Sequence, residues 1–402
     1  MKILLLGKGK SIKYIKKYLK VKKVNILHAV FKEEYNSKYI LADDKILEFN
    51  DIDYVIKSPG IPETNSLYIK LALKFKFINE LDLLTLFNEK VKTIVVTGSN
   101  GKTTFVSMLN YLLKTAGLKT ILCGNSFEPI TKYYKKYNSI DYLIIEQSSF
   151  QLHNLSMHKP YISLILNLQE NHLDNSYSLN SYYRNKMNIY RYIDKDCYFI
   201  SDNNKLINLN LCNGNIIDLF IYPYFDKLND KLKHYEKNIN YIYTITKLLS
   251  LDEKIIENLN YFTFLKYRNT VKVVKDITFI NDSKSTSLDA TLFALSNINK
   301  GSNIILIIGG LDKKIDYKRI STIKVNNLIV YGSISTIVKK HYKNCIIAKN
   351  LKDSFKIATL IHTDNKIILF SPSTSSYEEF KNFEERGSYF NKLIKLYEKN
   401  KI

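Results

Sequence analysis

The first part of the chain alternates between short apolar runs and apolar residues at helical spacing. The run "KILLL" ends in a glycine turn at residues 7–11, and Ile12, Ile15 and Leu19 then recur as on one face of a helix. The run "YVIKSPGIP" predicts another strand that ends at Ser58–Gly60. A strand, a glycine turn and a helix in this order are typical of half of a dinucleotide-type fold, and also of βα units that bind no ligand.

A second segment opens near Val91. The apolar run "KTIVV" predicts a buried strand, and the stretch "TGSNGKTT" separates it from a helical pattern that includes Met108 and Leu112. Two further apolar runs, at 142–146 and 162–167, predict strands of the same segment. Strands that alternate with helices in this way predict a parallel sheet.

A third segment follows residue 266. The stretch "VKVVKDITFIND" predicts a hairpin that turns near Asp276. The apolar runs at 303–310, 327–333 and 366–373, with helical stretches between them, predict another α/β unit.

These three segments predict the fold class and the domains. A chain of 402 residues is too long for one ordinary hydrophobic core. We predict an α/β protein with an N-terminal Rossmann-like domain at residues 1–88, a central P-loop ATPase-type domain with a parallel sheet at 89–266, and a C-terminal Rossmann-like domain at 267–402.

The charge balance is strongly basic, with 60 Lys and Arg against 38 Asp and Glu and a formal net charge of +22. Such a charge can indicate nucleic-acid binding. The lysines are spread along this chain, however, as in the product of an AT-rich genome. We therefore expect no nucleic-acid partner, although the charge should attract anionic substrates.

Cysteine spacing and the lengths of the apolar runs exclude several other classes. The four cysteines form no C-x-x-C pair, so they predict neither a zinc site nor a disulfide framework. The apolar residues before Gly7 are too few for a signal peptide, and no apolar run reaches the roughly 18 residues of a membrane span. We expect a cytoplasmic protein without a membrane span.

The stretch "TGSNGKTT" lies between a predicted strand and a predicted helix, which is where a phosphate-binding loop must lie. Lys102 would reach the β- and γ-phosphates of ATP, and Thr103 would offer its hydroxyl to Mg²⁺. The loop departs from the general G-x-x-x-x-G-K-[ST] pattern, because Val96 occupies the position of the first Gly. The predicted ATP-binding residues of the loop are Gly98, Ser99, Asn100, Gly101, Lys102, Thr103 and Thr104.

This loop and four further stretches resemble motifs of one family. "TGSNGKTT" resembles the ATP loop of the Mur ligases and of their relative folylpolyglutamate synthase. "EQSSFQL" (146–152), "NDSKST" (281–286), "SPSTSSYEEFKNFEERG" (371–387) and "SPGI" (58–61) resemble motifs of the D-glutamate-adding Mur ligases, in the same order. The resemblance implies a three-domain, ATP-dependent amide ligase of peptidoglycan precursor synthesis.

The resemblance also implies the reaction. ATP would phosphorylate the carboxylate of UDP-N-acetylmuramoyl-L-alanine, and the amine of D-glutamate would attack the resulting acyl phosphate. An L-alanine-adding Mur ligase and folylpolyglutamate synthase remain alternatives, but the C-terminal "FKNFEERG" argues against both. A P-loop switch or motor is disfavoured by Glu146 and by "NDSKST". We expect a monomer.

Two Mg²⁺ sites are implied by the same resemblance. Glu146, at the end of a predicted strand, would hold the first ion with Thr103, and His172 would hold the second. Lys186, taken alone, would be a solvent-exposed lysine on a helix. In the family this lysine is carbamylated by CO₂, which would give the His172 site the oxygen ligand that Mg²⁺ prefers.

Further residues are assigned by resemblance to the reacting groups. Asn125 matches the Asn of the family's G-N-I-G, which contacts the reacting carboxylate, but Ser126 and Phe127 replace its Ile-Gly. The expected catalytic residues are Lys102, Asn125, His172, Lys186 and Arg268. The residues assigned to D-glutamate are Thr286, Lys313, Ser376 and the backbone of Phe383, and those assigned to the UDP part are Lys10, Ser11 and Gly60.

The nucleotide outside the loop would be bound by a separate set. Asn238 would contact adenine and Arg268 the γ-phosphate, whose oxygens suit the planar guanidinium. Asp282 would meet the ribose, and Lys284 the phosphates. The chain departs from the family near these positions, since Tyr235, Tyr267 and Thr270 stand where it has Asn, His and Glu.

Overall fold

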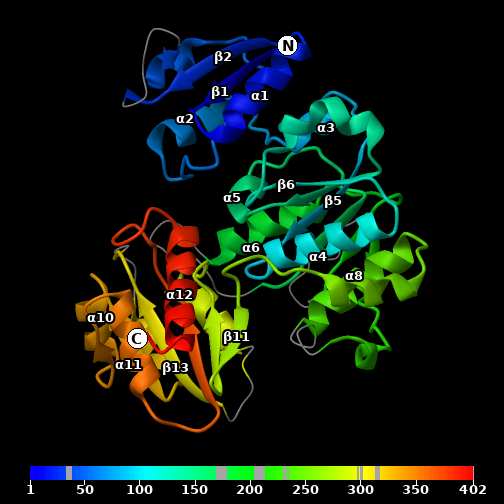
Figure 1. Cartoon of the computed structure of the whole chain (residues 1–402). Helices are drawn as coiled ribbons and strands as arrows, with labels where there is room; N and C mark the ends of the chain where they lie inside the picture. The colour runs from blue at the N-terminus through cyan, green and yellow to red at the C-terminus, as the bar shows by residue number, and fades with distance from the viewer. Residues whose placement is uncertain are drawn as a thin grey trace. The chain divides into compact units, whose positions relative to one another are not determined.

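The computed structural model describes residues 1–32, 39–168, 179–202, 213–229, 232, 235–296, 298, 302–312 and 317–401. The chain forms two compact units, Met1–Phe262 and Thr263–Ile402 (Figure 1). Among these described residues, the first unit contains two β-sheets and the second contains one. The predicted α/β class is confirmed, because helices connect parallel strands in all three sheets. The predicted domain limits stay predictions, since the contacts divide the chain into two units rather than three.

The first sheet has four parallel strands in the order β3-β2-β1-β4. Strand β1 (Lys2–Leu6) is buried along most of its length, and helix α1 (Lys10–Val21) follows a turn at Gly7, whose φ is +92°. Helix α1 buries the apolar face that the spacing predicted. The other elements here are β2 (Asn25–Val30), β3 (Ile40–Leu41), η2 (Asp44–Glu48), β4 (Tyr54–Lys57), α2 (Ser66–Lys74) and α3 (Asp82–Leu86).

The second sheet has six parallel strands in the order β10-β9-β8-β5-β7-β6. Strand β5 (Lys92–Thr97) is buried after its first residue, and helix α4 (Lys102–Thr115) follows it after the predicted phosphate loop. The other elements are β6 (Thr120–Gly124), η3 (Ile130–Ser139), β7 (Tyr142–Glu146), α5 (Ser149–Leu152), β8 (Ile162–Ile165), α6 (Leu179–Met187), η4 (Asn188–Tyr190), β9 (Tyr198–Ile200), β10 (Asn215–Ile217), η7 (Phe225–Lys227), α8 (Glu236–Leu248) and η8 (Glu253–Tyr261).

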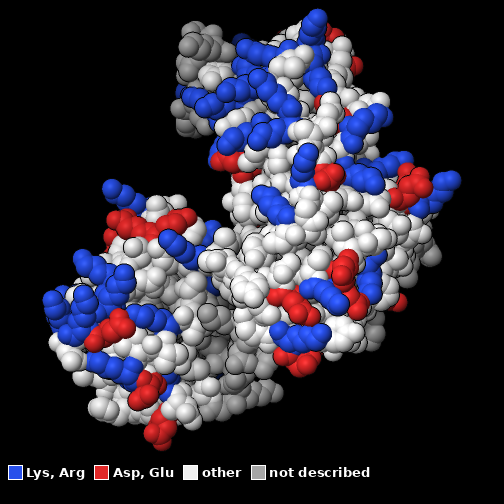
Figure 2. All heavy atoms as spheres, turned by 45° about the vertical axis from the view of Figure 1, so that its right-hand side comes forward, with Lys and Arg blue, Asp and Glu red and all other residues white. Residues whose placement is uncertain are grey.

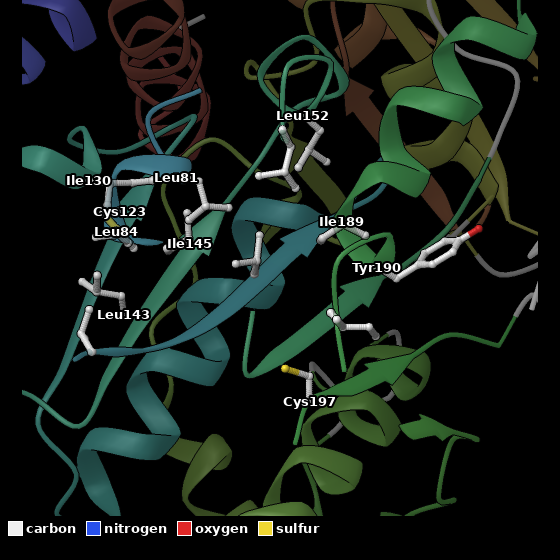
Figure 3. Close-up of a cluster of buried hydrophobic side chains, with 14 of the residues drawn as sticks. Leu81, Leu84, Cys123, Ile130, Leu143, Ile145, Leu152, Ile189, Tyr190 and Cys197 are labelled. Carbon is white, nitrogen blue, oxygen red and sulfur yellow. The ribbon is translucent and has the colours of Figure 1, made fainter. Parts of the chain in front are cut away.

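A buried apolar cluster fixes the elements around the predicted phosphate loop between β5 and α4 (Figure 3). It includes Leu143 and Ile145 of β7, together with Ile189 and Tyr190, which directly follow α6. Full burial of such a side chain contributes about 1.5–3 kcal/mol. The cluster therefore anchors the C-terminal end of α6 next to the strand that ends at Glu146.

The third sheet, in the second unit, has six strands in the order β11-β12-β16-β13-β14-β15. Strands β11 (Thr270–Val274) and β12 (Ile277–Asn281) form the predicted hairpin, which turns through Lys275 and Asp276 at positive φ. The remaining pairs are parallel. The other elements are α9 (Leu288–Ser296), β13 (Asn303–Gly309), η9 (Lys318–Thr322), β14 (Asn327–Tyr331), α10 (Ser335–His341), β15 (Ile346–Ile347), α11 (Leu351–Leu360), β16 (Lys366–Phe370) and α12 (Phe383–Glu398).

The surface carries lysine and arginine across the face seen in Figure 2, mixed with uncharged and acidic residues. Basic side chains are dense over the first sheet, where helix α1 contains no acidic residue. Within the described ranges, no helix is both long and apolar enough to cross a membrane.

Candidate active site

The loop between β5 and α4 has the geometry of a phosphate-binding loop. Gly101 directly precedes α4 with φ of +78°, a left-handed conformation that glycine adopts most readily. No side-chain hydrogen bond caps the helix at Gly101, and the first turn of α4 contains no acidic residue. The N-terminal N–H groups and the helix dipole therefore favour an anion at this position.

Asn167 holds the loop in place. Its Oδ1 accepts a hydrogen bond from Asn100 N at 2.9 Å, and its Nδ2 donates to Asn100 O at 3.0 Å. Lys102 Nζ donates to Gly98 O at 2.7 Å and to Ser99 O at 3.0 Å, so its ammonium lies over the loop backbone. The charge of Lys102 is thus within the region that the phosphates would occupy.

Glu146 ends strand β7 beside this loop and is 1% exposed. Its Oε1 accepts hydrogen bonds from Asn125 Nδ2 and from Ser126 Oγ, both at 2.9 Å. Its Oε2 is buried and has no hydrogen-bond partner among the described residues. A buried carboxylate oxygen without a partner is costly, so the site is suited to a cation.

Thr103 extends this arrangement to the helix. Its Oγ1 lies 3.2 Å from Ser126 Oγ, which in turn bonds Glu146. No cluster of three or more His, Cys, Asp or Glu side chains occurs in the part of the chain that the structure describes. One carboxylate and one hydroxyl, completed by phosphate oxygens and water, are the hard oxygen ligands of Mg²⁺. Glu146 and Thr103 therefore fit the predicted first Mg²⁺ site.

Lys186 on α6 is 1% exposed, so it is not a solvent-exposed lysine. Its Nζ donates to Gly98 O at 2.9 Å and lies 4.4 Å from the centre of the Tyr182 ring. Burial lowers the pKa of Lys186 well below its usual value, and the charge of Lys102 lowers it further. The amine thus lies against the phosphate loop in an environment that favours its neutral form.

A narrow cavity within the first unit connects residues of the first sheet to residues around α5. It is lined by Ser11 and Lys57 from the first part of the chain and by Gln147 and Gln151 from the second. Lys10 is largely exposed and forms an ion pair with Glu128. Of the residues assigned to UDP, Ser11 therefore lines a cavity, and Lys10 lies at the surface.

The second unit contains a buried polar network around Asp282, which directly follows β12. Asp282 Oδ2 accepts hydrogen bonds from Ser371 Oγ at 2.9 Å and from Ser285 Oγ. Burial raises the pKa of Asp282 to about 6. The predicted phosphate ligand Lys284 has its Nζ 4.1 Å from the centre of the Phe383 ring.

Arg386 joins the loops of the second unit that carry the residues assigned to D-glutamate. Its guanidinium is fully buried and donates to Ser283 O at 2.9 Å, to Ser283 Oγ at 3.1 Å and to Thr374 O at 3.1 Å. Ser283 Oγ also donates to Phe383 O at 2.9 Å. Thr286, Ser376 and Phe383 therefore lie on segments that one arginine holds together.

Comparison with known proteins decides the family. The UDP-N-acetylmuramoylalanine--D-glutamate ligase of Francisella philomiragia subsp. philomiragia is 32% identical over 365 residues, which cover 86% of this chain and 87% of the relative. The ligase of the same name from Francisella tularensis subsp. holarctica is 32% identical over 372 residues, which cover 88% of each chain. The chain belongs to the Mur ligase family. The Mur ligase middle domain matches residues 96–219.

Solved structures of Mur ligases share the fold. A pseudomurein peptide ligase type C from Methanothermus fervidus aligns with a TM-score of 0.58 at 17% identity and covers 98% of this chain and 99% of its own. A MurF ligase from Thermotoga maritima in complex with ADP aligns with a TM-score of 0.57 at 14% identity, covering 99% and 94%. The chain therefore has the three-domain fold of Mur ligases, with one of the three sheets in each domain.

The structure brings part of the predicted Mur ligase site together. In the first unit, Lys186 contacts the phosphate loop at Gly98, and Asn125 contacts Glu146. The second unit contains Arg268, Asp282, Lys284, Thr286, Ser376 and Phe383, and the roles of these residues stay predictions. Asn238 lies in the first turns of α8. Apart from its own chain neighbours, no atom of the described residues lies within 4 Å of the position that a Cβ would take at Gly60. His172 and Lys313 lie outside the described residues.

Ser126 links Thr103 to Glu146 and is not among the residues predicted for the site. In the sequence, Ser126 is a departure from the family's G-N-I-G. Gly124 (φ +101°), which matches the first glycine of that motif, makes a close approach to the backbone of Glu146. A hydroxyl directly after Asn125 was the signal that could have identified Ser126.

Proposed function

We propose that this protein is an ATP-dependent ligase that joins D-glutamate to UDP-N-acetylmuramoyl-L-alanine and releases ADP and phosphate. The relatives that carry the name of this reaction align with most of the chain. The single observation that supports the chemistry is the unpartnered Oε2 of Glu146 beside a phosphate loop. It would provide a cation site at the point where a nucleoside triphosphate would end. We further propose that the reaction takes place in the cytoplasm, on a monomer.

The first step brings two anions together, a substrate carboxylate and the γ-phosphate. The carboxylate oxygen attacks phosphorus, the bond from phosphorus to the β,γ-bridging oxygen breaks, and ADP leaves. Lys102 would neutralise the phosphates, and Asn125, whose Nδ2 is fixed by Glu146, would orient the substrate carboxylate. When bound, Mg²⁺ supplies positive charge at the transferring phosphoryl group. Thr103 and Glu146 would hold it.

The second step needs D-glutamate beside the acyl phosphate. Its neutral amine attacks the carbonyl carbon, the carbon–oxygen bond to phosphate breaks, and the nitrogen gives up one proton, so that an amide and inorganic phosphate form. Thr286, Lys313, Ser376 and the backbone of Phe383 would bind the carboxylates of D-glutamate, while Arg268 and Lys284 would bind phosphate oxygens. The buried Arg386 supports this assignment by holding the segments of Thr286 and Phe383 together.

Lys186 would complete the second metal site as a carbamate. Carbamylation requires the neutral amine as nucleophile toward CO₂, and a lowered pKa favours that form. The product carries two oxygens and a negative charge, which suit Mg²⁺ better than the single nitrogen of His172. The burial of Lys186 against Gly98 supports this proposal, because a buried cation beside Lys102 would otherwise remain unfavourable.

Phosphate release from ATP tests the proposed function. The enzyme is given UDP-N-acetylmuramoyl-L-alanine with D-glutamate, L-glutamate, L-alanine or no amino acid, and phosphate is measured. We expect release with D-glutamate alone, because the second unit must recognise the stereochemistry of a dicarboxylate. Equal rates with all four would contradict the proposal.

The structural neighbours leave a second candidate, another amide ligase of the same fold. UDP-N-acetylmuramate with L-alanine, and a folate with L-glutamate, are the substrate pairs that test it. Release with either pair, and none with D-glutamate, would favour that candidate.

A further inference from the structure

A polar cluster connects the segment after β4 to the helix that carries Lys186. It consists of Glu63 and Tyr68 from the first part of the chain and of His153, Asn154 and Asn185 from around α5 and α6. We call it the His153 cluster. Tyr68 and Asn185 are buried, and the side chains of His153 and Glu63 are 26% and 16% exposed. None of the five is a predicted site residue.

His153 lies at the centre of this cluster. Its Nδ1 is 3.0 Å from Glu63 Oε1 and 3.0 Å from Asn185 Oδ1. Its Nε2 is 2.8 Å from the hydroxyl oxygen of Tyr68, and this hydroxyl donates to Asn154 Oδ1 at 3.1 Å. Asn185 Nδ2 donates to Glu63 Oε1 at 3.3 Å. One imidazole thus links a carboxylate and a phenol of the first part of the chain to α6.

The same cluster borders Lys186 directly. Asn185 precedes Lys186 in the sequence, and Asn188, which follows two residues later, donates to Leu152 O at 3.0 Å and to His153 O at 3.2 Å. Residues on both sides of Lys186, one in α6 and one in η4, are therefore bonded to Leu152 and His153 at the end of α5. A hydrogen bond such as the one from Lys186 Nζ to Gly98 O is lost when its length grows beyond about 3.5 Å. Small movements of α6 would consequently displace the amine.

The cluster also reaches the segment assigned to UDP. Glu63 lies three residues after Gly60, and Lys57 Nζ, at the end of β4, donates to Ile61 O at 2.8 Å. Lys57 Nζ also lies 5.5 Å from the centre of the Tyr68 ring. The turn that contains Gly60 is thus joined to His153 through Glu63 on one side and Tyr68 on the other.

We propose that His153 is a positioning residue that holds α6 against the segment after Gly60, and so fixes the Lys186 amine at the phosphate loop. This inference rests on the proposed function, because it deepens the role given there to Lys186. It predicts that the geometry of the Lys186 site depends on contacts made by the part of the chain assigned to the UDP substrate.

Two conservative variants separate the two nitrogens of the imidazole. In His153→Asn, the side-chain NH₂ takes a position near that of Nδ1 and can still donate to Glu63 and Asn185. In His153→Gln, the NH₂ lies further out, near Nε2, and can reach only Tyr68. A role in positioning α6 requires the contacts of Nδ1 with Glu63 and Asn185. It therefore predicts that His153→Asn is more active than His153→Gln. His153→Ala removes both sides, and His362→Ala, at an exposed histidine of the second unit, is the control.

The experiment measures phosphate release at varied UDP-N-acetylmuramoyl-L-alanine, ATP and bicarbonate for these variants and for Glu63→Gln. In His153→Gln and His153→Ala, we expect the bicarbonate concentration for half-maximal activity and the KM for the UDP substrate to rise about 10-fold, as for other residues that orient a metal ligand. His153→Asn should stay near the wild type, and the KM for ATP should hardly change. Urea unfolding of each variant accompanies these measurements.

A second readout does not depend on activity. In ¹³C-bicarbonate, the wild-type enzyme should give a carbamate ¹³C NMR signal that His153→Ala loses and His153→Asn keeps. The opposite result is that the His153 variants unfold more easily in urea while the half-maximal bicarbonate concentration, the KM for the UDP substrate and the carbamate signal stay unchanged. In that case the cluster is a structural contact and the positioning role is overturned. A wild type that releases no phosphate with D-glutamate would overturn the proposed function instead, and the carbamate signal would still test His153.

Discussion

Lys186 is a residue whose surroundings, rather than whose sequence neighbours, determine its chemistry. Helix α6 is polar, with Asn185 and Arg184 beside Lys186, and offers no apolar stripe that would predict burial. The cluster that contains Ile189 and Tyr190 nevertheless draws the end of the helix into the core. The lysine is buried because the residues after it are.

Replacement of this amine should remove most activity. Lys186→Ala should lower phosphate release with D-glutamate by about 100-fold or more, because it removes the group that we propose acts at the charged reaction centre. A short-chain carboxylic acid added to the variant should restore part of the rate, since its carboxylate can take the place of the carbamate. Lys195→Ala, at an exposed lysine nearby, is the control. Full activity of Lys186→Ala would contradict the metal-ligand role.

The sequence could predict only part of the candidate site. The phosphate loop and Glu146 follow buried apolar strands, and parallel strands place their carboxyl ends at one edge of a sheet. His153 could not be found this way, because its partners Glu63, Tyr68 and Asn185 are distant in the sequence and its contacts depend on how α5 and α6 pack. The buried state of Lys186 was hidden for the same reason.

Helix α3 shows how one element is fixed by a single buried carboxylate. Asp82, at its first position, is fully buried and accepts hydrogen bonds from the backbone N–H groups of Asn79, Met157 and His158 at 2.8–3.0 Å, as well as from Ser156 N. These bonds join the segment before α3 to the loop that leads into β8. The carboxylate thus fixes the path of the chain between the first two sheets.

Asp82→Asn tests this arrangement. An amide keeps the shape of the side chain but has a single acceptor oxygen, so at least one of these buried N–H groups loses its partner, at a cost of roughly 1–3 kcal/mol each. We expect the free energy of unfolding of the variant, measured in urea, to fall by about 2–4 kcal/mol. Asp196→Asn, at an exposed position, should change it little. An unchanged midpoint for Asp82→Asn would show that the bonds contribute no net stability.

Strand prediction succeeded for several inner strands, but it missed β6 (Thr120–Gly124), which is as long as β7, and the shortest strands. The runs at 142–146 and 303–310 are strands β7 and β13, which lie inside their sheets. The run at 366–373 was predicted too long: β16 ends at Phe370, before Ser371 and Pro372. Strands β9, β10 and β15, of two or three residues, were not predicted, because so short a run has no measurable period.

At the scale of the whole molecule, the excess of basic residues is the most general property. Basic side chains are dense over the first sheet, whose segments are assigned to the UDP substrate, and Lys102 lies at the phosphate loop, which is assigned to ATP. Such a charge raises the rate at which anions reach the surface, and salt screens it over about 10 Å at 0.1 M. The charge is therefore expected to affect the association of the substrates more than the chemical step.

Salt should therefore affect substrate binding more than turnover. Between about 0.05 M and 0.5 M potassium chloride, we expect the KM for the UDP substrate and for ATP to rise several-fold while kcat changes little. Steady-state phosphate release measures both, and the uncharged solute sucrose at matched osmolality is the control. A kcat that falls as steeply as kcat/KM would indicate that salt perturbs the folded state instead.

The unpartnered Oε2 of Glu146 has a consequence for inhibitor chemistry. A small molecule that presents an amidinium or a primary ammonium to this oxygen would form a charge-assisted hydrogen bond in a site shielded from water. It would compete with magnesium rather than with adenine, and so would not need to resemble a nucleotide. Its potency should decline as the magnesium concentration of the assay is raised.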